Sequence, residues 1–66
     1  MVEIYTFDKN DECLNMIFTQ SAVVSCQDKN IRVYYPNGDF QNIAYKEMIS
    51  HFMASGSNVM VIKVRV

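Results

Sequence analysis

The stretch IRVYYPNGDFQNI, residues 31–43, carries the strongest local structural signal in the chain. Apolar and polar side chains alternate up to Tyr35, which predicts a β-strand over residues 31–35. Proline presets φ at the first turn position, asparagine tolerates the next, and Gly38 supplies the positive φ that follows. The stretch therefore predicts a hairpin that pairs 31–35 with a second strand over 39–43.

Further strand-like segments flank this hairpin on both sides. Residues 2–7 predict a first strand, and the polar residues 8–12 predict a turn. The apolar residues 13–18 and 21–26 fit either one bent strand or two short ones. Residues 58–66 predict a last strand that returns to the sheet. The face of this strand expected in the core consists of Met60, Ile62, Val64 and Val66.

The hydrophobic period changes between the hairpin and the last strand. Apolar side chains recur there at helical spacing, which predicts an amphipathic helix over residues 44–54, ended by Gly56. The apolar stripe expected to pack on the sheet consists of Tyr45, Met48, Ile49, Phe52 and Met53. The side chains expected to face water are Lys46, Glu47, Ser50 and His51.

Composition favours a sheet around this helix, because the chain has eight valines and six isoleucines but a single leucine. Sixty-six residues suffice for one small domain, which we expect to span 1–66. The predicted class is α+β and mainly β, in the order β-β-β-β-α-β. The predicted architecture is a curled antiparallel sheet or a small SH3-like barrel.

The sequence lacks the residue patterns of catalytic, metal and cofactor sites. Cys13, Cys26 and His51 are far apart and form no zinc-type spacing, and the two glycines form no phosphate-binding loop. The acidic residues of the 8–12 segment are typical of a solvated turn. We therefore expect a protein that is not an enzyme and that uses no cofactor or metal.

The two cysteines and the N-terminal residues indicate in which cellular compartment the protein is expected. No apolar run approaches a membrane span, and residues 1–12 lack the layout of a signal peptide. These features predict a cytoplasmic protein with two reduced thiols, Cys13 and Cys26, buried as small hydrophobes.

A small core and a last strand that is apolar on both faces predict self-association. A domain of this size gains little stability from its own core, and pairing with a second copy would add to it. The last strand is the best candidate, through its surface or its edge, and the expected assembly is a homodimer. The interface candidates are Val59, Val61, Lys63 and Arg65. We expect an accessory module that binds protein, in the style of small phage or mobile-element proteins.

Residues 23–66 resemble the LytTR-type DNA-binding domain of response regulators. The matching pieces are Val23-Val24, residues 30–35, residues 37–40, residues 45–49 and Ile62-Lys63. Where that family carries a His-Arg-Ser run, this chain reads Lys63-Val64-Arg65. The resemblance implies DNA binding through the basic residues of the last strand, as the alternative to protein binding. A nucleic-acid surface would draw on Arg32, Lys46, Lys63 and Arg65, with Tyr34 as the aromatic beside Arg32.

Overall fold

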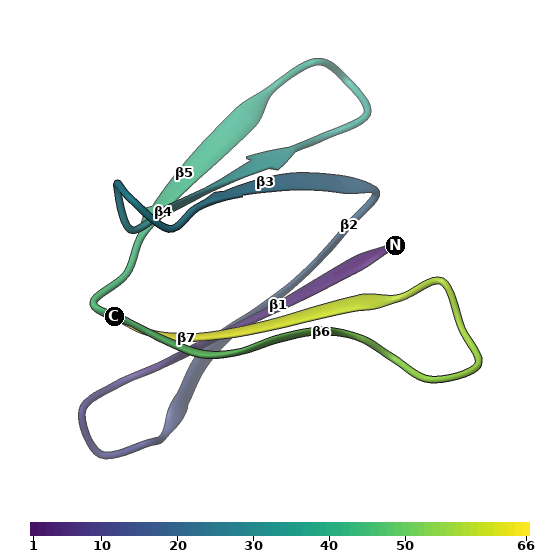
Figure 1. Cartoon of the computed structure of the whole chain (residues 1–66). Helices are drawn as coiled ribbons and strands as arrows, with labels where there is room; N and C mark the ends of the chain where they lie inside the picture. The colour runs from purple at the N-terminus through teal and green to yellow at the C-terminus, as the bar shows by residue number, and fades with distance from the viewer.

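A computed structural model describes all residues 1–66 as an all-β chain with 62% of its residues in strands (Figure 1). It contains no helix, and so none that could span a membrane. The strands are β1 (Val2–Phe7), β2 (Cys13–Thr19), β3 (Ser21–Ser25), β4 (Asn30–Tyr34), β5 (Phe40–Ala44), β6 (Glu47–Met53) and β7 (Met60–Arg65).

The strands form two sheets that face one another. The four-stranded sheet has the order β2-β1-β7-β6, and the three-stranded sheet has the order β3-β4-β5. The chain passes between the sheets at Gln20 and again after Ala44. Residues 13–26 are therefore two strands, one in each sheet. Neighbouring strands pair antiparallel, as predicted, with one exception: β1 and β7 are parallel.

The hairpin between β4 and β5 confirms the turn predicted around Gly38. Gly38 has a φ of 91°, and the Tyr35 N–H donates to the Asp39 carbonyl at 2.9 Å. The Asn37 side-chain oxygen accepts from the Asp39 N–H at 3.0 Å. The polar turn after β1 is also present, because Asp8 Oδ1 accepts from two backbone N–H groups within it. Local side-chain chemistry thus sets both turns.

The core is one cluster between the two sheets, to which both sheets contribute. The buried hydrophobic residues are Ile4, Ile31, Val33, Tyr45, Ile62 and Val64. The inner face of β7 is largely as predicted, since Ile62 and Val64 are buried and Met60 packs against the cluster. Val66, at the chain end, is 36% exposed instead.

The predicted helix over residues 44–54 is wrong, and with it the α+β class. Residues 47–53 form β6, which pairs antiparallel with β7 and carries a β-bulge between Met48 and Ser50. A bulge inserts one residue and breaks the period of two, so the apolar residues fall at spacings that mimic a helix. Tyr45 is buried as expected, but Ile49 and Phe52 are 42% and 49% exposed.

Two further expectations about architecture are corrected. The sheets do not close into a barrel, so the SH3-like alternative is wrong. The last strand, β7, lies between β1 and β6 and has no free edge. The free edges of the four-stranded sheet belong to β2 and β6 instead.

Candidate functional site: the outer face of the four-stranded sheet

The outer face of the four-stranded sheet is ordered in rows that run across the strands from β2 to β6. One row consists of Phe18, Glu3, Val61 and Phe52. The next consists of Met16, Tyr5, Lys63 and Ser50. The third consists of Cys13, Phe7, Arg65 and Glu47. Strand pairing thus brings together side chains that are far apart in the sequence.

Large apolar side chains dominate this face. Met16 and Phe18 on β2 are 56% and 57% exposed, and Ile49 and Phe52 on β6 are nearly as accessible. Tyr5, Phe7 and Val61 lie half-buried between the two edges. Exposed apolar side chains that gather on one face commonly mark an interaction surface. We call this set the outer apolar face: Tyr5, Phe7, Met16, Phe18, Ile49, Phe52 and Val61.

Tyr5 organises the middle of the outer apolar face. Its ring meets the Phe18 ring edge-on at a centroid distance of 6.4 Å. Its hydroxyl donates to Glu3 Oε1 at 2.6 Å, and this hydrogen bond is the main reason that the pKa of Tyr5 is raised. The Lys63 amine lies 5.8 Å from the centre of the same ring. The Glu3 carboxylate and the Lys63 amine are thus both held against an aromatic side chain.

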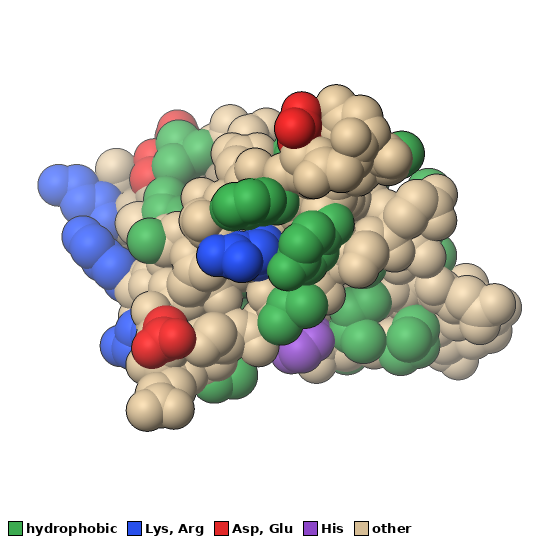
Figure 2. All heavy atoms as spheres, turned by 90° about the horizontal axis from the view of Figure 1, so that it is seen from above, with side chains coloured by type: hydrophobic (Ala, Val, Ile, Leu, Met, Phe, Trp, Pro, Cys, Tyr) green, Lys and Arg blue, Asp and Glu red, His purple; other side chains and the backbone are tan.

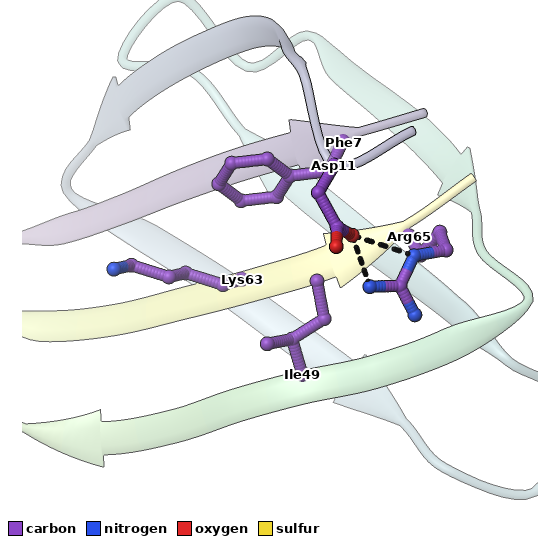
Figure 3. A pocket seen from close by; sticks show the side chains of 5 residues that line it. All are labelled: Phe7, Asp11, Ile49, Lys63 and Arg65. Atoms are coloured by element: carbon purple, nitrogen blue, oxygen red, sulfur yellow. Dashed lines mark hydrogen bonds and ion pairs between the residues drawn. The ribbon is translucent and has the colours of Figure 1, made fainter. Parts of the chain in front are cut away.

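The charged end of the face is a hollow of about 260 Å³, lined by Phe7, Asp11, Ile49, Lys63 and Arg65 (Figure 3). The Arg65 guanidinium pairs there with the carboxylates of Asp11 and Glu47. The hydrogen bonding that Arg65 donates to the Asp11 carboxylate is the main cause that raises the pKa of Arg65. Figure 3 shows the Lys63 side chain pointing away from the Asp11–Arg65 pair. Lys63 is the cation of this face that pairs with no carboxylate.

The three-stranded sheet carries a second, smaller surface on its own outer face. Figure 2 looks onto this side of the molecule and shows a basic side chain between hydrophobic ones. The Arg32 guanidinium lies 4.5 Å above the Phe40 ring, and its Nε donates to Asn42 Oδ1 at 3.0 Å. Tyr34 lies beside Phe40, with ring centroids 6.5 Å apart. This surface combines one fixed cation with two accessible aromatic rings.

The structure does not gather the four basic candidates on one surface. Arg32 lies on the three-stranded sheet, whereas Lys63 and Arg65 lie on the outer face of the other sheet. Lys46 lies in the connection between the sheets, where its N–H donates to the Arg65 carbonyl at 2.7 Å. No continuous basic stripe results. Among the interface candidates, Val61 and Lys63 belong to the outer face, and Val59 is half-buried just before β7.

Both cysteines are free thiols and both are exposed. The expectation of buried thiols is therefore wrong: Cys13 lies at the bulged start of an edge strand, and Cys26 lies in the turn after β3. Neither belongs to a group of three or more potential metal ligands, and no such group is present.

Sequence reasoning missed most of the outer apolar face. Ile49 and Phe52 were expected in the core, as part of a helix. Met16 and Phe18 alternate with Ile17, but apolar residues on both sides of a strand do not reveal which side faces water. The exposed set is recognisable only when the pairing partners of β2 and β6 are known.

Neither a family model, nor a curated protein, nor a solved structure matches this chain.

Proposed function

We propose that this protein is a non-enzymatic cytoplasmic accessory module that binds protein, a second copy of itself included, through the four-stranded sheet. The outer apolar face supports this proposal most directly. Its exposed side chains come from both edges of the sheet, and half-buried aromatic residues join them in the middle. Removing such a surface from water is favourable, and this favours its association with another apolar surface.

The charges on the face suit a protein partner better than a polyanion. Arg65 is engaged by the carboxylates of Asp11 and Glu47, which leaves little positive charge for a phosphate backbone. Lys63 is the remaining cation, and its amine lies over the Tyr5 ring, whereas the Arg65 ion pairs form one end of the face. An apolar centre with a polar margin is the usual anatomy of a protein interface. The free thiols support the cytoplasmic location, where cysteines stay reduced.

Light scattering after size exclusion tests the proposal with a matched pair of variants. Phe18 and Phe40 are 57% and 54% exposed and lie on the outer faces of different sheets. We expect the protein to elute at twice its chain mass of 7.6 kDa. Phe18→Glu should shift it toward the monomer, and Phe40→Glu should not. A folded wild-type monomer at high micromolar concentration, or a dimer that only Phe40→Glu dissolves, would contradict the proposal.

A second candidate function is binding of single-stranded nucleic acid, favoured by the contact of Arg32 with Phe40. Exposed aromatic rings beside a cation can stack bases and contact a phosphate. Fluorescence titration with a labelled single strand at low and physiological salt tests it. Arg32→Gln should reduce the affinity and Lys63→Gln should not. The reverse result would favour the last strand, as the LytTR resemblance implies, and no binding at low salt would remove the candidate.

A further inference from the structure

Strand β2 is a free edge of the four-stranded sheet and lacks the usual protection of such edges. Its sequence, CLNMIFT, contains no charged residue and no proline. Five of its seven residues are exposed. Natural proteins normally guard an edge with charges, prolines or bulges, because unpaired N–H and C=O groups recruit another strand.

The opposite edge, β6, is protected against pairing with another strand in the usual ways. It carries Glu47 and His51, and the bulge at Ile49 interrupts it near its middle. The irregularity in β2 is confined to its start, where Cys13 and Leu14 together face Phe7. Regular pairing geometry therefore covers Asn15 to Thr19 on β2, and on β6 only the shorter stretch from Ser50 to Met53.

The hydrogen bonding of Met16 shows which backbone groups of β2 point outward. The Met16 N–H donates to the Asn15 side-chain oxygen at 2.9 Å instead of to β1. In an antiparallel pair, every second residue turns its N–H and C=O away from its neighbour. Met16 is such a residue, and Phe18 follows two positions later with the same orientation. The Asn15 amide thus occupies a donor that a further strand could use.

We propose that a second copy of the chain pairs antiparallel with β2, with the twofold axis passing through Met16. Met16 then faces Met16 of the second copy, and Leu14 faces Phe18. The segment is self-complementary in this register, because exposed apolar residues meet one another on the outer face. No charged residue lies in β2, so no like charges oppose each other across the axis. The inference rests on the proposed self-association and specifies its geometry.

Edge pairing joins the four-stranded sheets of the two copies into one continuous eight-stranded sheet. The Met16 N–H then bonds to the Met16 carbonyl of the second copy, and Asn15 releases it. The two outer apolar faces become continuous across the axis. A twofold interface of this kind is closed, so it removes the free edge without forming a fibre.

Backbone pairing is tested by Met16→Pro against Met16→Thr. Proline removes an N–H that the protomer's own sheet does not use, so the fold is expected to survive. Met16→Pro should raise the dimer Kd by more than about tenfold, since two intermolecular hydrogen bonds are lost. Met16→Thr keeps the N–H and should raise the dimer Kd less. Circular dichroism checks that both variants are folded, and equal Kd values for the two variants would overturn the proposal.

A charge exchange tests the register and holds even where Met16→Pro fails to fold. Met16→Lys and Met16→Glu should each raise the dimer Kd by about tenfold, because like charges meet on the axis. Mixing the two variants should restore the dimer, because lysine then faces glutamate. Val23→Lys is the control, since Val23 is also 56% exposed and lies on β3, an edge of the other sheet. It should leave the dimer intact.

Phe52→Glu separates the two geometries that the sheet allows. Phe52 lies on β6, at the far side of the sheet from β2, so edge pairing predicts an unchanged dimer. If Phe52→Glu dissolves the dimer and no Met16 variant does, the copies pack face to face; the edge proposal then fails and the proposed function stands. A mixture of Met16→Lys and Met16→Glu that stays monomeric also overturns the edge proposal. A wild-type monomer overturns both.

Discussion

At the scale of single residues, Gly38 shows how one backbone angle holds a hairpin. Its φ of 91° suits glycine, and no atom lies within 4 Å of where a Cβ would be. The cost of substitution is therefore conformational and not steric. Gly38→Val should lower the free energy of unfolding by more than about 1 kcal/mol, and Gly38→Asn by less, because asparagine visits positive φ more readily. Urea denaturation measures both, and equal losses would contradict this explanation of the turn.

Tyr45 makes stability depend on pH in the alkaline range. Burial is the main reason that its pKa is raised above the ordinary 10.0, with Cys26 nearby as a further cause. Because the folded state holds the Tyr45 proton more tightly than the unfolded chain does, the neutral phenol contributes to the free energy of unfolding. This contribution is fully present below about pH 10 and is lost as pH rises through the pKa of the folded state. Tyr45→Phe should therefore weaken the alkaline decline of the urea midpoint. An unchanged decline would show that Tyr45 ionises as readily in the folded state as in the unfolded chain.

At the scale of elements, β6 separates two residues that a helix would have buried together. Met48 packs against the core from the inner face, whereas Phe52 is 49% exposed on the outer face. Met48→Ala should lower the free energy of unfolding by about 2 kcal/mol or more, and Phe52→Ala by less than about 1 kcal/mol. Chemical denaturation of the two variants compares them directly. A larger loss for Phe52→Ala would contradict the strand and favour the helix.

At the scale of the whole molecule, stability depends on a very small core. Only eight of 66 residues are buried, so each of the six buried hydrophobic residues contributes a large share of the stability. Ile62 is 1% exposed and Val66 is 36% exposed, although the alternation of the last strand puts both on one face. Ile62→Ala should cost about 2–5 kcal/mol and leave much of the protein unfolded, and Val66→Ala should cost far less. Thermal unfolding of both variants, followed by circular dichroism, checks this contrast. Similar melting temperatures would contradict it.

The sequence by itself determined the features that depend on neighbours along the chain. The Tyr35–Asp39 turn and the Asp8 turn follow from short-range side-chain and glycine chemistry, and both are present. The buried face of β7 follows from strict alternation at Ile62 and Val64. In each case, the forces act within a few residues, so the local pattern suffices.

Only the tertiary structure decided the identity of β6, the parallel pairing of β1 with β7, and the composition of the outer apolar face. Pairing with β7 makes residues 47–53 a strand. The bulge at Ile49 shifts the alternation of this strand, so its apolar residues recur at helical spacing. Met16, Tyr5 and Lys63 share one row only because β7, from the far end of the sequence, pairs with β1. Such contacts are long-range, and their free energy depends on every strand being in place, so no local pattern encodes them.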